Sequence, residues 1–101
     1  MKETISYADF DKVDIRVGTV VDAKEFPEAR FPAIQLWIDF GPELGILKSS
    51  AQITDYYNIQ ELIGNQLIAV VNFPSKQIGP FMSEVLVLGV VEAARKVVLL
   101  S

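Results

Sequence analysis

The polar side chains best suited to bind a ligand lie in one segment, VVNFPSKQIGPFMSEVLVLG (70–89), between two apolar runs. They are hydrogen-bonding or cationic, and the first acid of the segment is Glu84. Pro74 and Pro80 restrict the backbone and Gly79 permits a turn, so a rigid loop is expected to present these side chains. The arrangement suits binding better than catalysis. The polar side chains are Asn72, Ser75, Lys76, Gln77 and Ser83, and the apolar Met82 lies among them.

Catalytic chemistry is strongly restricted, because the chain contains no histidine and no cysteine. This excludes disulfides, thiolate nucleophiles, imidazole bases and zinc sites built from these ligands. The 13 acids are scattered and form no Asp-x-Asp-x-Asp-Gly loop for calcium. The pairs Ser75–Lys76 and Lys48–Ser49 lack a third orienting group, and neighbours on a strand point to opposite faces. We therefore expect no enzyme, no metal site and no cofactor.

The net charge is −4, from 9 basic and 13 acidic residues, and this acidity opposes phosphate binding at long range. A local basic face is still possible, because Arg30, Lys48 and Lys76 lie in or beside the three segments expected to be most exposed. The alternative is that these cations only keep the surface solvated. Part of the acidic excess lies near the N-terminus, at Glu3, Asp9, Asp11 and Asp14.

The length of 101 residues predicts a single domain, residues 1–101, with one hydrophobic core. The first residues are polar and lack the apolar stretch of a signal peptide, and no apolar segment approaches the length that crosses a bilayer. These features predict a cytoplasmic protein that does not insert into membranes.

Several segments have the pattern of strands. Residues 33–40 alternate between an apolar face and a second face on which Trp37 lies. Residues 14–26 alternate as well, with Gly18 where the strand of a small barrel would bend. Residues 67–71 and 85–91 are apolar throughout and are expected to be buried on both faces. The predicted strands are 14–26, 33–40, 46–51, 67–71 and 85–91.

A helix is predicted over residues 54–64, between the third and fourth strands. Asn58 followed by Glu61 resembles a capping box at the start of the helix. Gly64 can adopt the left-handed backbone conformation that ends a helix. Three strands, a helix and two strands is the order of an all-β, five-stranded OB-fold barrel. The competing SH3-like barrel would not place a capped helix there. A short N-terminal helix and a C-terminal strand, residues 97–100, extend the predicted barrel.

Apolar surface beyond the needs of a barrel predicts an interface between chains. The N-terminal helix, residues 6–12 with Ser6 as its cap, carries Tyr7 and Phe10 at helical spacing. The runs VLVLGVV and VVLL are apolar on both faces, although a small barrel needs only the inward face to be apolar. We therefore predict a homodimer formed through these elements. The alternative is that the helix and C-terminal strand cover the surface within one chain.

Five motifs follow one another between Lys12 and Gly89, within a match that covers nearly the whole chain, from Tyr7 to Leu100. In this order and spacing they resemble the stand-alone tRNA-binding-domain proteins, and among them the CsaA type, described as an export-related chaperone. The motifs are KVDIRVGTVVDAKEFPEAR (12–30), LWIDFG (36–41), KSSAQI (48–53), ELIGNQLIAVVNFP (61–74) and QIGPFMSEVLVLG (77–89).

The resemblance implies an OB fold, a homodimer and a binding site around KSSAQI and NFPSKQIGPFMSE. It also implies two activities, namely binding of structured tRNA regions such as the elbow and binding of unfolded or precursor polypeptides. Arg30 matches the loop between the first two strands, and Phe31 follows it. The implied site comprises Arg30, Phe31, Lys48, Ser49, Ser50, Gln52, Asn72, Lys76, Gln77, Met82 and Ser83.

The chain departs from the family pattern after FPEAR, where relatives often continue with basic residues and this sequence reads FPAIQL (31–36). Fewer cations there favour apolar peptide segments over RNA. The alternative function is therefore a purely polypeptide-binding export chaperone with little or no RNA affinity. In that case Met82, Phe31 and Phe81 would form an adaptable apolar pocket.

For RNA, the cations would contact phosphates, and Phe26, Phe31 or Phe81 would offer a stacking face. Apolar packing across the loop would require the same aromatic residues, so both roles stay open. Phe73 and Trp37 are expected in the core or an interface rather than in contact with a ligand. Ser49 and Ser50 have a second possible role as partners of local backbone groups.

Overall fold

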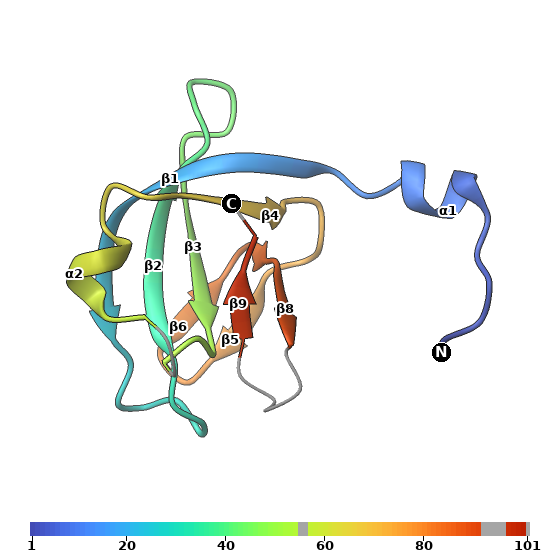
Figure 1. The fold of residues 1–101 in the computed structure, drawn as a ribbon. Helices are drawn as coiled ribbons and strands as arrows, with labels where there is room; N and C mark the ends of the chain where they lie inside the picture. The colour runs from blue at the N-terminus through green and yellow to red at the C-terminus, as the bar shows by residue number, and fades with distance from the viewer. Residues whose placement is uncertain (55–56, 92–96, 101) are drawn as a thin grey trace.

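Five antiparallel strands curve into a nearly closed barrel in the computed structural model, which describes residues 1–54, 57–91 and 97–100 (Figure 1). Their order in the sheet is β3-β2-β1-β4-β7. The predicted all-β OB-fold barrel is confirmed. The strands are β1 (Ile15–Glu25), β2 (Ile34–Asp39), β3 (Ile46–Ala51), β4 (Gln66–Val70) and β7 (Leu86–Val87).

Alternation along the strands builds the core, as the sequence predicts. On β2 the side chains of Ile34, Leu36 and Ile38 are buried inside the barrel, and Trp37 lies on the outer face. Gly18 on β1 is buried where the strands approach closely, since a Cβ there would lie 2.8 Å from the Phe40 ring. Any larger residue at this position would push β1 away from β2.

The segment between β4 and β7 forms a hairpin, where the sequence predicts only a rigid loop. Its strands are β5 (Lys76–Ile78) and β6 (Phe81–Ser83), and Gly79 turns between them with φ of 55°. Few β-branched or apolar residues signal these short strands, so the sequence pattern does not reveal them. Pairing stiffens the segment further than its prolines would.

The single strand predicted over 85–91 is wrong. The chain instead forms β7, which pairs with β4, and then β8 (Gly89–Val91), which pairs with β9 (Val97–Leu99). Leu88 lies at the change of partner, where its N–H donates to Ile68 O and its carbonyl accepts from Leu100 N. The segment is not buried on both faces, since Leu86 of β7 and Val90 of β8 are about half exposed.

The helix between β3 and β4 is much shorter than the predicted 54–64, because α2 spans only Ile59–Leu62. Asn58 caps it as predicted, and its Oδ1 accepts from the Glu61 N–H at 2.9 Å. Gly64 ends the turn in the predicted left-handed conformation, with φ of 90°. A cap and a terminating glycine this close together leave room for one turn. Residues 55 and 56 of the predicted helix lie outside the described residues.

The N-terminal helix α1 (Tyr7–Asp11) extends away from the barrel (Figure 1). Ser6 caps it as predicted, in a reciprocal capping box with Asp9. None of its five residues, all of them described, is buried. The helix therefore covers no apolar surface of its own chain, contrary to the intrachain alternative drawn from the sequence.

Candidate functional site

The outer face of β1, β2 and β3 carries a patch of polar and aromatic side chains. The strand register aligns Asp22, Trp37 and Lys48 in one row across the three strands. Lys24, Gln35 and Ser50 form the next row on the same face. Side chains on this face point away from the core, because strand residues alternate and those between the two rows are buried. In an OB fold this is the face that binds oligonucleotides.

A small aromatic cluster fixes the loop between β1 and β2 against the β5–β6 hairpin. The ring centroid of Phe81 lies 5.5 Å from that of Phe26 and 5.7 Å from that of Trp37, both edge-on. Phe26 and Phe81 are only 3% and 6% exposed. The prediction that either ring offers a stacking face is therefore wrong, because these rings pack across the loop. Phe31 remains 55% exposed at the loop.

Three cationic groups lie over the aromatic rings of this region. Lys48 Nζ is 5.2 Å from the centre of the Phe81 ring. Lys24 Nζ is 5.2 Å from the centre of the Trp37 ring. In the loop, the Arg30 guanidinium is 5.4 Å from the Phe31 ring. Each contact holds a positive charge beside an apolar surface, an arrangement that suits a ligand with both phosphates and bases.

A groove of about 500 Å³ separates the end of β3, the β5–β6 hairpin and β7. It brings together four predicted site residues that are far apart in sequence, and its other described walls include the apolar side chains of Phe73, Ile53 and Leu86. Phe73 is 52% exposed within this chain, although the sequence predicts it in the core or an interface. The four predicted residues in the groove are Ser50, Gln52, Lys76 and Ser83.

The predicted serines serve the fold. Ser49 is 1% exposed, and its hydroxyl donates to the Val85 carbonyl at 2.9 Å. The Ser50 N–H donates to Ser83 Oγ at 3.0 Å. Ser49 and Ser83 therefore fasten β3 to the segment after β6. Ser49 therefore has the alternative role predicted from the sequence, that of a hydrogen-bond partner for a backbone group. Its side chain has almost no exposed surface for a ligand.

The other predicted residues lie apart from the β3 face. Asn72 binds the N-terminal segment, since Oδ1 accepts from Asp14 N at 2.9 Å and Nδ2 donates to Lys12 O at 2.7 Å. Gln77 and Met82 pair across the hairpin on the face opposite Phe81. The structure thus separates the predicted set into the β3 face with its groove, the exposed side of the hairpin, and a structural link at Asn72.

Lys24 and Trp37 are part of this face, but the sequence interpretation does not include them in the site. The alternation of residues 33–40 already assigns Trp37 to the outer face, so a signal exists for this residue. Lys24 offers none, because the pairing of β1 with β2 and its contact with Trp37 place it in the patch.

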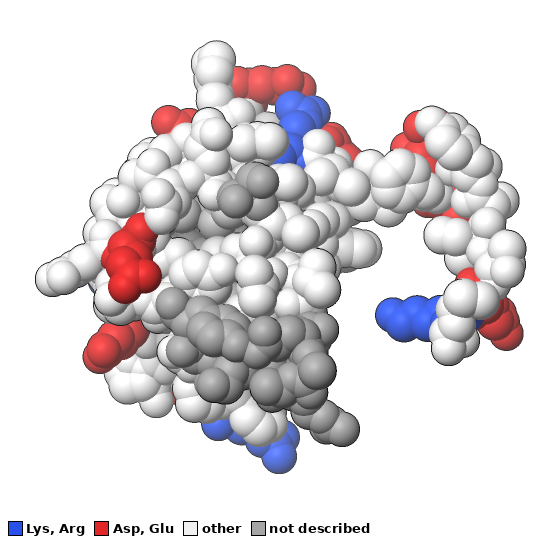
Figure 2. Space-filling model, viewed as in Figure 1, with Lys and Arg blue, Asp and Glu red and all other residues white. Residues whose placement is uncertain are grey.

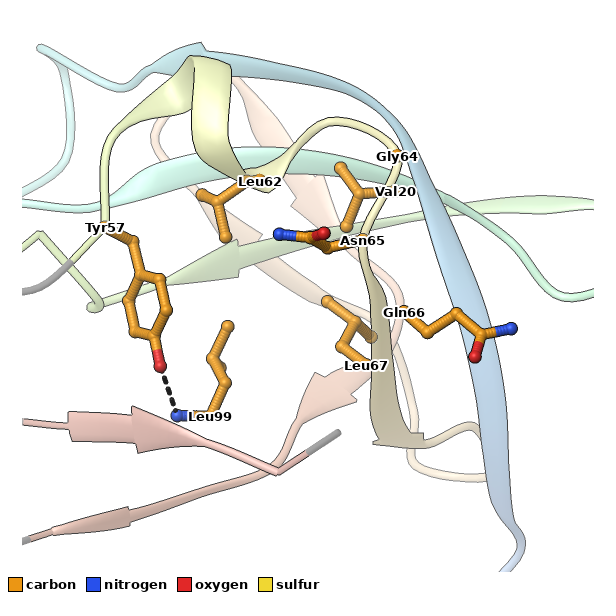
Figure 3. A pocket seen from close by; sticks show the side chains of 8 residues that line it. All are labelled: Val20, Tyr57, Leu62, Gly64, Asn65, Gln66, Leu67 and Leu99. Carbon is orange, nitrogen blue, oxygen red and sulfur yellow. Dashed lines mark hydrogen bonds between the residues drawn. The ribbon is translucent and has the colours of Figure 1, made fainter.

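A second cleft, of about 470 Å³, lies between α2, β4 and β9 (Figure 3). The Tyr57 hydroxyl accepts from the Leu99 N–H at 2.9 Å at its edge. Among the described residues that line this cleft, only Tyr57 has a titratable side chain, and none belongs to the predicted site. The cleft therefore offers no catalytic pair.

The described part of the chain has neither a metal-binding cluster of acids nor a helix that could span a membrane. No group of three acidic side chains there lies close enough to hold a metal ion. No helix of the described residues has the length and apolar character needed to cross a membrane.

Residues 15–101 match the family described as "Putative tRNA binding domain". The chain belongs to this tRNA-binding-domain family. Among curated members, the methionine–tRNA ligase of Bdellovibrio bacteriovorus is 38% identical over 83% of this chain. That of Flavobacterium psychrophilum is 32% identical over 86% of this chain. The chain spans only 12% of the length of each ligase.

Solved structures of the family are similar over nearly the whole chain. The chaperone CsaA of Bacillus anthracis is 58% identical with a TM-score of 0.90, over 97% of this chain and 88% of that one. CsaA of Picrophilus torridus is 52% identical with a TM-score of 0.92, over 97% and 90%. A MetRS-related protein of Pyrococcus horikoshii is 26% identical with a TM-score of 0.85, over 98% and 88%. These similarities confirm the resemblance to CsaA.

Proposed function

We propose that this chain binds tRNA without catalysing a reaction, through the outer face of β1 to β3 and the adjoining hairpin. The observation that carries the proposal is the row of Lys48 and Trp37, with Lys24 over the Trp37 ring, on the face that OB folds use for oligonucleotides. Arg30 in the neighbouring loop and Lys76 in the groove extend the positive charge. Membership of the tRNA-binding-domain family supports the same ligand.

Some of the acids behind the net charge of −4 lie away from the proposed face, on an arm that also carries Lys2 and Lys12. Glu3, Asp9 and Asp11 belong to the N-terminal arm that extends from the barrel, and this arm carries acidic side chains in Figure 2. The Debye length is about 8 Å at physiological salt, so charges on the arm are largely screened from distant phosphates. Local cations then govern contact with the RNA backbone.

The test is the salt dependence of tRNA binding, measured by fluorescence anisotropy with labelled bulk tRNA. Each phosphate contact contributes about −0.7 to −0.9 to the slope of log K against log[salt]. Lys48→Ala and Lys76→Ala should each weaken binding and make this slope shallower by about that amount. Lys2→Ala, which removes the same charge from the N-terminal arm, is the matched control. Binding that is absent, or that both site variants leave unchanged, would contradict the proposal.

A second candidate function is the binding of unfolded or precursor polypeptides in the groove. The specific observation in its favour is the apolar wall of Phe73, Leu86 and the buried Ile53, of which Phe73 and Leu86 are about half exposed. Polar Gln52 and Ser50 lie beside it, which suits a segment with apolar side chains and a polar backbone. The similarity to structures named as CsaA chaperones points the same way. Phe73→Ser should then weaken binding of a permanently unfolded, labelled polypeptide and leave tRNA affinity unchanged.

We also propose a homodimer formed through the N-terminal arm and the strands near the C-terminus. Tyr7 and Phe10 of α1 are 79% and 54% exposed, and Val90 and Leu86 are about half exposed. The described part of the face around β8 and β9 carries few charged side chains (Figure 2). Exposed apolar surface of this kind usually marks an interface.

Light scattering coupled to size exclusion tests the dimer. Tyr7→Ser combined with Phe10→Ser should shift the mass to that of one chain, whereas Phe31→Ser, an equally exposed apolar residue on the barrel, should not. A single-chain mass for the unmodified protein would contradict the proposal. A cytoplasmic location stays a prediction from the sequence.

A further inference from the structure

Trp37 is held rigidly on the outer face of the barrel. It lies on β2, between Asp22 of β1 and Lys48 of β3 in the same row. The Phe81 ring meets it nearly at a right angle, 80° between ring planes, with centroids 5.7 Å apart. Strand pairing on both sides and this aromatic contact fix the orientation of the indole before any ligand arrives.

A flexible side chain, that of Lys24, lies over one face of the Trp37 ring. Lys24 Nζ lies 5.2 Å from the ring centre, and Lys24 itself is exposed. An exposed cation–π contact contributes about 0.5–1 kcal/mol, whereas stacking of a nucleobase on an aromatic residue contributes about 1–3 kcal/mol. A base can therefore displace the ammonium from the ring, which leaves Lys24 at the edge of the base.

We propose that Trp37 is the stacking platform for one unpaired RNA base, with Lys24 and Lys48 binding the phosphates on either side of it. This inference rests on the proposed RNA-binding function and adds to it. It identifies single-stranded nucleotides as the ligand of this face. The base would lie on the indole face that Lys24 now covers.

The other aromatic residues of the region fit this role less well. Phe26 and Phe81 are 3% and 6% exposed, so neither offers a free face. Phe31 is exposed, but it lies in the loop after β1 rather than on a paired strand. Phe81 also lies on a paired strand under a lysine, but its ring is buried, so Trp37 alone among these four rings combines a paired backbone with a partly exposed ring. Its indole also has the largest stacking surface of any side chain.

Charge favours a nucleotide over a polypeptide at this position. Among the side chains of a peptide, arginine and lysine can pack on an indole through cation–π contacts. Lys24 and Lys48 would repel both of them. Asp22 is the acid in the same row, and one of its oxygens already accepts from the Ala23 N–H at 2.9 Å. Two cations around an aromatic ring instead complement a base with its flanking phosphates.

Quenching of intrinsic fluorescence tests the proposal directly, because Trp37 is the only tryptophan of the chain. The probes are octa-adenylate RNA and an abasic octamer with the same ribose-phosphate backbone, with a fully paired RNA duplex as a third ligand. Stacking predicts saturable quenching by octa-adenylate and little quenching by the abasic octamer or the duplex. Equal quenching by the abasic octamer, or none by octa-adenylate, would overturn the proposal.

Variants give a second measurement, with labelled octa-adenylate followed by anisotropy. Trp37→Leu keeps an apolar side chain but removes the ring, and should weaken binding by roughly 5- to 150-fold. Trp37→Phe keeps a smaller ring and should recover most of the affinity. Circular dichroism checks that both variants fold. If Trp37→Leu folds and binds as well as the unmodified chain, the platform is excluded.

The same protein is assayed in parallel with labelled tRNA, which separates this inference from the function on which it rests. Retained tRNA binding without quenching by octa-adenylate would reject the stacking platform and leave the proposed function intact. Quenching by octa-adenylate without tRNA binding would support the platform and reject tRNA as the ligand. Loss of both signals would reject both proposals.

Discussion

Glu84 and Lys48 exchange two hydrogen bonds that close the barrel beside the candidate site. Glu84 N–H donates to the Lys48 carbonyl at 2.8 Å, and Glu84 Oε1 accepts from the Lys48 N–H at 3.0 Å. The carboxylate thus takes the place of a strand partner at the edge of β3. The Lys48 side chain remains free to lie over Phe81. The contact joins the residue that follows the β5–β6 hairpin to β3, the strand that carries Lys48.

Glu84→Ala is expected to lower the free energy of unfolding by about 1–3 kcal/mol, because the Lys48 N–H loses its charged partner. Urea denaturation measures the change. Glu84→Gln keeps an acceptor and should cost clearly less, while Glu3→Ala in the exposed arm should cost little. Equal stability of the Ala and Gln variants would show that the side-chain acceptor does not stabilise the barrel.

Ser49→Ala should destabilise the protein without changing the tRNA affinity of the folded fraction. The buried hydroxyl donates to Val85 O, and its loss leaves a buried carbonyl without that partner, at a cost of about 1–3 kcal/mol. Thermal denaturation and anisotropy with labelled tRNA measure the two quantities. Ser75→Ala, at an exposed serine in the same region, is the control. An affinity loss at unchanged stability would instead indicate direct contact with the ligand.

Asn72→Ala should release the segment that connects α1 to the barrel. The amide holds Lys12 and Asp14 across nearly 60 positions of sequence, and both hydrogen bonds disappear in this variant. Amide hydrogen exchange of residues 12–14 should therefore speed up, while exchange in β2 stays slow. Asn72→Asp keeps the acceptor for Asp14 N–H and should show an intermediate rate. Unchanged exchange in the Ala variant would contradict the linking role.

Asp14 gives a prediction about pH. The hydrogen bonds from Arg16, 2.7 Å between Nε and Oδ1, lower the pKa of the Asp14 carboxyl below its usual range, and the guanidinium charge adds to the effect. A lowered pKa in the folded state means that this pair stabilises the fold above the pKa of the unfolded chain. The contribution is lost as the pH falls through the folded-state pKa.

NMR titration of the Asp14 side-chain carboxyl carbon checks the sign. The midpoint should lie below that of an unperturbed aspartate and should move up in Arg16→Gln. The difference in stability between Arg16→Gln and the unmodified protein should be constant at neutral pH and shrink in strong acid. Lys12→Gln, which removes a nearby cation without a contact to Asp14 among the described residues, should leave the midpoint almost unchanged.

Local patterns account for much of what the sequence predicts correctly. Alternation over 33–40 gives both the buried face of β2 and the outward position of Trp37, because side chains of a strand alternate whatever its neighbours are. Ser6 and Asn58 cap the two helices, because capping involves residues only three apart. The absence of histidine and cysteine excludes thiolate nucleophiles, imidazole bases and zinc sites built from these ligands, whatever the fold.

Only the tertiary structure decided which polar residues serve the fold and which lie on the candidate site. Ser49 and Asn72 have the residue types of a binding site, yet their partners lie 36 and up to 60 positions away, where no local pattern reveals them. Lys24 joins the candidate site through the pairing of β1 with β2 and its contact with Trp37. Short-range rules determine strands and caps, while the pairing of distant strands decides which side chains meet, because it depends on the packing of the whole barrel.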